Sequence, residues 1–168
     1  AEAPSVSTTV RFYPPMLSHP IEPEEFAPLN AADFVAEWKW DGIRVQAASG
    51  KDANGKRIAR LYSRSGEDIS GSFPDLVAGF DFDAVLDGEL LIKRGGGVQD
   101  FNTLQQRLNR KSVNAKLMAK FPAFIRVYDL LAEGDDDLRA LPFIERRAKL
   151  EAFVRAHPLA PIDLSEMI

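Results

Sequence analysis

Short stretches of alternating apolar and polar residues, separated by turn-forming glycines, constrain the fold of this chain more than any other feature. Alternation places every second side chain on one face of a strand, and residues 34–40, 43–47 and 123–131 alternate in this way. Two further strands are predicted over 58–63, which follows a turn-rich segment, and over 85–92, which is apolar but interrupted by Asp87-Gly88. Turns between such strands favour antiparallel pairing.

Four further segments are predicted to form helices, namely residues 73–80, 103–110, 113–121 and 142–156. The order is strands, then helices, then a strand and a helix, with hairpins dominating. This order predicts an α+β fold with a mainly antiparallel sheet and flanking helices, not a doubly wound parallel sheet. The triplet at 95–97 is predicted to be a hairpin tip, because its glycines lack the spacing of a phosphate-binding loop.

The chain has 168 residues, which is the size of a single domain. It has no cysteine, which excludes disulfides, thiolate catalysis and cysteine-bound zinc and fits a reducing cytoplasm. Two histidines are too few for a histidine-rich metal centre. No run of about 18 apolar residues is present, so we expect no membrane-spanning helix and no membrane partner. Six prolines in residues 1–28 predict an extended Pro-rich lead-in, which leaves residues 29–168 for the folded domain.

The net charge of −4 argues against a uniformly basic nucleic-acid binder, but the charges are unevenly distributed. Between residues 101 and 128 there are six basic residues and no acidic one: Arg107, Arg110, Lys111, Lys116, Lys120 and Arg126. Two interpretations stay open. Such a segment can bind a phosphate backbone, or it can be the solvated face of a helix.

Lys39 is the first candidate for chemistry. If Asp41-Gly42 forms the loop of a hairpin, Lys39 pairs with Arg44 across it, and Glu37 lies beside them. A neighbouring cation disfavours the charged form of a lysine, and a neutral amine is a nucleophile. The pattern therefore predicts either a reactive lysine or an exposed strand face with a cross-strand charge pattern.

Four other residues are candidates for ligand binding. Asp87 and Glu89 are carboxylates in apolar sequence, where burial is costly without a partner. They predict contacts to a ribose hydroxyl or a divalent cation, or else a second Asp-Gly turn with exposed carboxylates. Arg64 is suited to phosphate or ribose oxygens, unless it is an ordinary surface arginine. Tyr128 can stack on a base or pack in the core.

Together these residues form an ordered set of motifs. Residues 37–44 match E-x-K-x-D-G-x-R at every fixed position, and Ser63-Arg64, Asp87-Gly88-Glu89 and Tyr128-Asp129-Leu130-Leu131 follow in order. The chain resembles the adenylation (nucleotidyltransferase) domain of an ATP-dependent DNA ligase of the bacterial type. Residues 105–111 and 137–142 also resemble that branch, and the resemblance runs from about Phe12 to the end.

The resemblance implies an ATP-grasp-like fold and an enzyme of the bacterial cytoplasm that acts in DNA repair or replication. Lys39 would attack the α-phosphate of ATP, expel pyrophosphate and hold AMP as a phosphoramidate. The AMP would pass to the 5′-phosphate of nicked duplex DNA, and a 3′-hydroxyl would displace it to seal the strand. Mg²⁺ is the implied metal, with Glu89 near it.

The same resemblance implies how the nucleotide binds. Glu37 would read the adenine edge, and Tyr128 would stack on the adenine ring. Arg44 and Glu89 would bind the ribose, and Arg64 would lie near the ribose or the phosphate.

Two later motifs of the family, a Glu-Gly followed by an apolar run ending in lysine and then a lysine pair, are not found in this sequence. We therefore expect residues 29–168 to be a partial adenylation domain whose partners include the remaining ligase domains, the oligonucleotide-binding domain among them. We also expect it to bind ATP weakly and to self-adenylate poorly or not at all. An RNA ligase and a guanylyl-transferring capping enzyme are alternative activities. A non-enzymatic DNA-binding module built on residues 101–128 is a third alternative.

Overall fold

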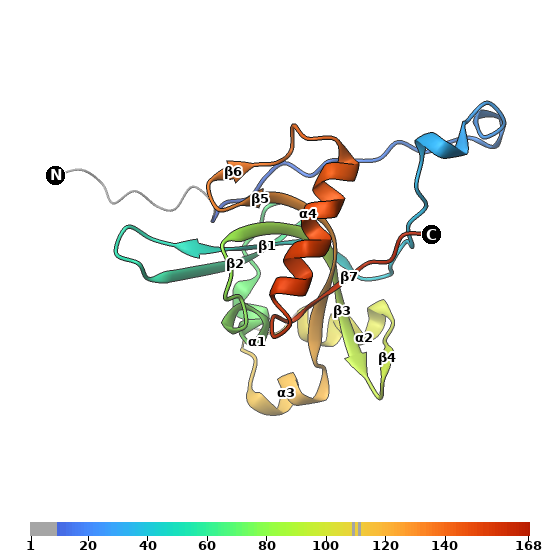
Figure 1. The fold of residues 1–168 in the computed structure, drawn as a ribbon. Helices are drawn as coiled ribbons and strands as arrows, with labels where there is room; N and C mark the ends of the chain where they lie inside the picture. The colour runs from blue at the N-terminus through green and yellow to red at the C-terminus, as the bar shows by residue number, and fades with distance from the viewer. Residues whose placement is uncertain (1–9, 109, 111) are drawn as a thin grey trace.

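One sheet organises the chain, and the computed structural model describes residues 10–108, 110 and 112–168 (Figure 1). Its strands are β1 Ile43–Lys51, β2 Arg57–Ser63, β3 Ala84–Arg94, β4 Gly97–Val98, β5 Ala123–Glu133, β6 Asp136–Asp137 and β7 Ile162–Leu164. The order is β2-β1-β3-β5-β6, with β4 on β3 and β7 on β5. Within the described residues every strand pair is antiparallel except β5 with β7, which is parallel. The predicted α+β fold with a mainly antiparallel sheet is confirmed.

All four predicted helices are present, with shifted ends. They are α1 Pro74–Ala78, α2 Phe101–Leu108, α3 Ala115–Lys120 and α4 Phe143–Ala156, and short 3₁₀ turns occupy η1 Pro23–Glu25, η2 Ala31–Asp33 and η3 Ser70–Ser72. Helix α3 begins later than predicted because the Asn114 side chain caps it by accepting the Leu117 N–H at 2.9 Å. Residue 109, inside the predicted 103–110 helix, lies outside the described residues.

None of the helices in the described ranges has the length and apolar character that crossing a membrane requires.

The main core lies between the sheet and its helices. Val45, Leu90 and Ile125 come from the three central strands and are fully buried, and they belong to one cluster with Leu76 of α1 and Phe153 of α4. Polar residues alternate with these positions on β1 and β3. The strands therefore present apolar side chains to the helices and polar side chains to the opposite face of the sheet.

Part of the predicted lead-in packs on that opposite face. Val10 and Tyr13 are buried in a second cluster with Leu131 of β5. The Gln46 side chain accepts the Tyr13 N–H at 2.9 Å and donates to the Tyr13 carbonyl at 2.7 Å. Residues 10–18, which we call the N-terminal strap, therefore belong to the folded body, whereas the first nine residues of the predicted lead-in lie outside the described residues.

Two local predictions near Lys39 are wrong. Residues 34–40 form no strand and make a single bridge, from Glu37 to Met167, and Asp41-Gly42 is not the loop of a hairpin. The reason is that β1 pairs with β2 on one side and with β3 on the other, so a hairpin partner would find no free edge. The second Asp-Gly sequence, at Asp87-Gly88, also makes no turn, because β3 runs through it without a break.

Candidate active site

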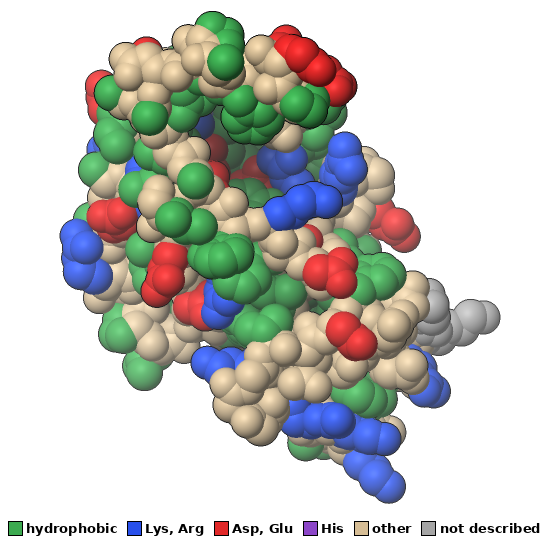
Figure 2. All heavy atoms as spheres, turned by 90° about the vertical axis from the view of Figure 1, so that its right-hand side faces the viewer, with side chains coloured by type: hydrophobic (Ala, Val, Ile, Leu, Met, Phe, Trp, Pro, Cys, Tyr) green, Lys and Arg blue, Asp and Glu red, His purple; other side chains and the backbone are tan. Residues whose placement is uncertain are grey.

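A hollow of about 680 Å³, which we call the site hollow, opens on the sheet face opposite the main core. Its volume lies in the range of small-molecule sites. Every residue that the sequence singled out for nucleotide chemistry lines it: Glu37, Lys39, Arg44, Arg64, Glu89 and Tyr128. Figure 2 shows a hollow on this side of the molecule, with Lys or Arg and Asp or Glu side chains lying together inside it. The structure therefore brings together residues that are up to about half the chain apart in sequence.

Strands β1 and β3 position the central ion pair of the site hollow. Arg44 lies opposite Glu89 in the register, and Asp87 shares a face with Glu89 because the two are two positions apart on one strand. Arg44 donates through Nε and Nη2 to the Asp87 carboxylate at 3.1 and 2.7 Å, and Nη2 also donates to the Met16 carbonyl at 2.9 Å. Burial raises the pKa of Asp87, and the Arg44 guanidinium opposes that rise. Arg44 is thus held in one orientation, and within the described residues only its Nη1 lacks a hydrogen bond.

A β-bulge in β5 places two residues of this strand in the site hollow. Asp87 pairs with Asp129 while the next residue, Gly88, pairs with Val127, which leaves Tyr128 as the extra residue. Strict alternation would point Tyr128 and Asp129 to opposite faces, as the sequence predicted. Because of the bulge, both of these adjacent residues line the hollow.

Glu89 is, among the described residues, the one carboxylate of the site hollow that no arginine pairs with. It accepts the Gly42 N–H at 3.2 Å, and Tyr128 lines the same hollow. Burial raises the pKa of Glu89. Burial and the neighbouring carboxylates of Asp87 and Glu89 raise the pKa of Tyr128, so its phenol stays protonated.

The donor set for a metal is small. The described part of the chain contains no group of three or more His, Asp or Glu residues that could hold a metal ion. Among the described residues, Glu89 remains as the one carboxylate of the site hollow that no arginine pairs with. Because Mg²⁺ usually binds one or two carboxylates together with substrate phosphates and water, these residues fit an ion bound mainly through a triphosphate. They do not fit a metal held by protein ligands alone.

The segment that carries Lys39 is anchored through the next residue, Trp40. The indole Nε1 of Trp40 donates to the Ser165 hydroxyl at 3.0 Å, and the Arg126 guanidinium lies 4.2 Å from the centre of an indole ring. Arg126 is itself held by Asp163 of β7 through two hydrogen bonds of 2.9 and 2.8 Å. The position of Lys39 therefore depends on the C-terminal strand, not on a hairpin with Arg44.

Helix α4 contributes two arginines behind the site hollow. Arg147 Nη1 lies 4.0 Å from a carboxylate oxygen of Glu37 and is buried without a hydrogen bond among the described residues. Burial raises the pKa of Glu37, and the Arg147 charge opposes that rise. Arg146 donates to the Asp129 carboxylate at 2.9 and 3.0 Å, which ties α4 to the bulge of β5.

Sequence reasoning missed the residues that support the predicted ones. They are Met16, Leu17, Ser18, Trp40, Arg126, Arg146, Arg147 and Ser165. The contacts that position them join residues far apart in the sequence: Arg146 and Asp129 are 17 positions apart, Met16 and Arg44 are 28, and Trp40 and Ser165 are 125. No local pattern in the sequence marks such contacts.

The basic residues of 101–128 do not form one surface. Arg107 is fully buried, where it donates to the Asp75 carboxylate at 3.0 and 2.5 Å, and Arg126 is paired with Asp163. Lys111 lies outside the described residues. The prediction of a DNA-binding surface made by the whole segment is therefore wrong at Arg107 and Arg126, because aspartates within the fold already neutralise these two of its six cations.

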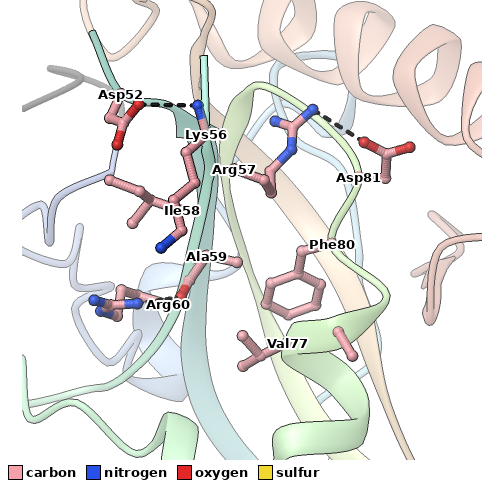
Figure 3. Close-up of a pocket in the computed structure, with 10 residues that line it drawn as sticks. Asp52, Lys56, Arg57, Ile58, Ala59, Arg60, Val77, Phe80 and Asp81 are labelled. Atoms are coloured by element: carbon pink, nitrogen blue, oxygen red, sulfur yellow. Dashed lines mark hydrogen bonds and ion pairs between the residues drawn. The ribbon is translucent and has the colours of Figure 1, made fainter. Parts of the chain in front are cut away.

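A second hollow of about 720 Å³ lies beside β2 and α1 (Figure 3). The carboxylates that line it already have hydrogen-bond partners within the protein: Asp52 accepts the Lys56 backbone N–H at 2.9 Å, and Asp81 accepts from the Arg57 guanidinium at 3.0 Å. Arg60 is also engaged, because its guanidinium donates to the Ala59 carbonyl at 2.8 Å and lies 3.4 Å from the Asp68 carboxylate. None of the residues predicted for chemistry lines it, so the site hollow is the candidate active site.

Comparison with known proteins places the chain in a family. The model of the ATP dependent DNA ligase domain matches residues 15–167. A probable DNA ligase of Koribacter versatilis is 34% identical over 139 residues, which cover 81% of this chain and 23% of that protein. DNA ligase C of Mycobacterium tuberculosis is 38% identical over 123 residues, 70% of this chain and 33% of that protein. The chain thus spans a third or less of the length of these two curated relatives.

Solved structures agree with the family match. The ligase domain of LigD from M. tuberculosis has a TM-score of 0.59 and 28% identity over 79% of this chain and 39% of that chain. A mycobacterial DNA ligase D complexed with ATP has a TM-score of 0.58 and 27% identity over the same shares. Because the family model covers nearly the whole chain and the sheet matches that of a ligase domain, this chain belongs to the ATP-dependent DNA ligase domain family.

Proposed function

We propose that this chain performs nucleotidyl transfer from ATP, with Lys39 as the nucleophile. The observation that carries the proposal is that six residues from five separate segments line one hollow. In the reaction the neutral Lys39 amine attacks the α-phosphorus of ATP and forms an N–P bond while the bond to pyrophosphate breaks. The amine loses one proton in this step, and the product is lysyl-AMP. Positioning and charge neutralisation supply most of the catalysis in phosphoryl transfer.

The nucleotide would bind across the three central strands. Tyr128 would stack on the adenine, and Glu37, an acceptor when ionised, would take a hydrogen bond from the adenine amino group. Glu89 and the free Nη1 of Arg44 would contact the ribose. Arg64, which follows β2 and lines the same hollow, would reach the ribose or the α-phosphate.

Mg²⁺ would lie between the triphosphate and Glu89 and would neutralise phosphate charge when bound. No protein group other than Glu89 is proposed as its ligand. The triphosphate itself would supply most of the coordination.

We further propose that residues 29–168, with the strap of residues 10–18 packed on their sheet, form the first part of an adenylation domain. Exposed apolar side chains before β1 support this, because Phe26, Phe34 and Trp38 are 60%, 54% and 58% exposed and other ligase domains could cover them. Transfer of AMP to the 5′-phosphate of nicked duplex DNA, and sealing by the 3′-hydroxyl, are proposed for the whole protein. Residues 1–168 alone should self-adenylate weakly, because the lysines of the later family motifs are not in this sequence.

Intact-mass spectrometry after incubation with ATP and Mg²⁺ tests the nucleophile. We expect one AMP adduct that is lost in acid and absent from a Lys39→Ala variant. Lys51→Ala, at an exposed position of β1, is the matched control and should keep the adduct. An adduct that persists in Lys39→Ala would overturn the assignment of Lys39.

The choice of nucleotide separates the ligase from a capping enzyme. GTP in place of ATP should give no adduct on this chain. A preference for GTP would favour guanylyl transfer. Ligation of nicked RNA but not of nicked DNA by a longer version of the chain would favour the RNA ligase alternative.

A further inference from the structure

Four exposed cations gather away from the site hollow, at the end of the sheet where β3 leaves and β5 begins. Lys93 and Arg94 are the last residues of β3, and Lys116 and Lys120 lie on α3. Figure 1 places α3 and β4 at the lower end of the molecule, and Figure 2 shows Lys and Arg side chains gathered at that same end. We call these four residues the basic surface.

Two aromatic rings lie against three of the four cations of the basic surface. The Lys120 ammonium lies 5.3 Å and the Arg94 guanidinium 6.0 Å from the centre of the Phe121 ring. The Lys93 ammonium lies 6.0 Å from the centre of the Phe124 ring. Cation–π contacts of this length orient the side chains but leave their positive charge uncompensated.

Carboxylates do not neutralise the basic surface. Within the described ranges none of its four cations forms an ion pair, in contrast to Arg107 and Arg126. The one acidic residue between positions 93 and 120 is Asp100, and it accepts the N–H and the hydroxyl of Thr103 at 2.9 and 2.8 Å. A local positive field thus persists on a chain whose net charge is −4.

The arrangement suits an extended polyanion. Lys116 and Lys120 are one helical turn apart, about 6 Å along α3. Duplex DNA carries a phosphate about every 3.4 Å of axis on each strand, so a pair with that separation can contact one strand. Phosphate contacts need no apolar groove and no base readout, and they position a protein on the duplex.

We propose that the basic surface binds the phosphate backbone of the duplex DNA whose nick the site hollow would serve. The choice of DNA among polyanions rests on the proposed function. The positive charge and the geometry of the surface do not rest on it. Binding here is independent of base sequence and depends strongly on salt, because each neutralised phosphate releases counterions.

Fluorescence anisotropy with a labelled, nicked duplex tests the proposal between about 0.05 and 0.2 M salt. The double variants Lys116→Gln/Lys120→Gln and Lys93→Gln/Arg94→Gln each remove two cations. Each should lower the slope of log K against log salt by about 1.8 and weaken binding at least about tenfold at the lower salt. Melting temperatures should stay close to that of the wild type, because all four side chains are exposed.

The matched control removes two exposed lysines elsewhere. Lys51→Gln/Lys56→Gln carries the same charge change at the β1–β2 hairpin, which Figure 1 places at the left of the molecule. It should leave the slope unchanged. Equal losses in all three double variants, or no loss in the basic-surface variants, would overturn the proposal.

Two further measurements separate the explanations. Vesicles of phosphatidylserine and phosphatidylcholine should not compete with the duplex, and binding of vesicles alone would assign the surface to a membrane. Lys39→Ala should lose the AMP adduct and keep the salt slope. If ATP does not label the chain but the salt slope of DNA binding is intact, the nucleotidyl-transfer proposal is overturned and the DNA-binding proposal is supported. If ATP labels the chain but DNA does not bind, the DNA-binding proposal is overturned and nucleotidyl transfer is supported.

Discussion

At the scale of single residues, burial determines the properties of the site carboxylates. Glu37, Asp87 and Glu89 lie against one sheet face, and burial raises the pKa of each. Two of the three have an arginine that opposes this rise at close range, and Glu89 accepts the Gly42 N–H instead. The folded protein therefore holds a proton on Glu89 more readily than the unfolded chain does.

The Glu89→Gln variant tests this shift through stability. The pKa of Glu89 is raised above 4.5 in the folded state, so the stability linked to its proton is fully present below about pH 4.5. That stability is lost as pH rises through the folded pKa. Since Gln does not ionise, the free energy of unfolding of the wild type should fall relative to the variant as pH rises toward neutrality.

Urea unfolding at a series of pH values measures this difference. Glu24→Gln, on an exposed 3₁₀ turn, is the matched control for the chemical change. A difference between wild type and Glu89→Gln that stays constant with pH would contradict the shift.

Gly42 is a position where space, not backbone angle, demands glycine. A Cβ at Gly42 would lie 2.3 Å from the Leu90 carbonyl oxygen and 2.7 Å from Leu91 Cδ2. Gly42→Ala should therefore push the segment with Lys39 off β3 and cost about 1–3 kcal/mol of stability. The AMP adduct on Lys39 should fall sharply, as intact mass would show.

Gly71→Ala is the control for this substitution. A Cβ at Gly71 meets nothing within 4 Å, so stability and adduct formation should stay close to those of the wild type. Equal behaviour of the two variants would argue against close packing at Gly42.

At the scale of elements, buried ion pairs decide how the helices join the sheet. Arg107 of α2 is fully buried and reaches Asp75 of α1, and its guanidinium lies 4.6 Å from the centre of the Phe73 ring. It also donates to the backbone carbonyls of Ser72 and Phe121. One arginine thus ties together α1, α2 and the entrance to β5.

Removal of Asp75 would leave that buried charge without its partner. Asp75→Ala should cost about 3 kcal/mol, because an unpaired buried guanidinium is strongly unfavourable. Asp81→Ala breaks a surface pair with Arg57 and should cost less than about 1 kcal/mol. Chemical denaturation of both variants measures the two changes in the free energy of unfolding. Equal losses of stability would mean that the Arg107–Asp75 pair stabilises the fold no more than a surface pair does.

At the scale of the whole molecule, one face of the sheet forms the core and the other forms the candidate active site. The helical face supplies the main core. The opposite face carries the site hollow and, beside it, the N-terminal strap of residues 10–18. The strap connects packing on the sheet with the candidate active site. Gln46 holds Tyr13, and the Met16 carbonyl accepts a hydrogen bond from Arg44 inside the site hollow.

Gln46 is the point at which the strap can be released. Gln46→Ala would leave the buried N–H and carbonyl of Tyr13 without partners, at a cost of about 2–4 kcal/mol. The strap should detach, and trypsin should cleave after Arg11 faster than in the wild type. Gln46→Glu keeps the acceptor for the Tyr13 N–H and should show a smaller effect. Unchanged cleavage in Gln46→Ala would show that other contacts hold the strap.

Much of the fold was predictable because local rules govern it. The strands that became β1, β2, β3 and β5 followed from apolar content and alternation, and all four helices followed from composition and proline position. The positive φ of 60° and 81° at Gly95 and Gly96 matches the predicted hairpin tip. Such features depend on neighbours within a few residues.

The errors came where distant contacts overruled a local pattern. Asp41-Gly42 has the composition of a hairpin turn, but both edges of β1 are already occupied by β2 and β3. Alternation in β5 failed at Tyr128 because a bulge shifts the register. The basic pattern of 101–128 failed at Arg107 because an aspartate 32 residues away neutralises it.

The sequence by itself determined the fold class, the order of the main elements and the residue types of the site, because the motifs carry Lys39 and its companions at definite spacings. The tertiary structure alone decided which groups meet. It placed Arg44 on Asp87, Trp40 on Arg126 and Ser165, and the strap over the sheet. The physical reason is that strand register, a bulge and buried ion pairs are settled by the whole packed sheet, so no short stretch of sequence contains them.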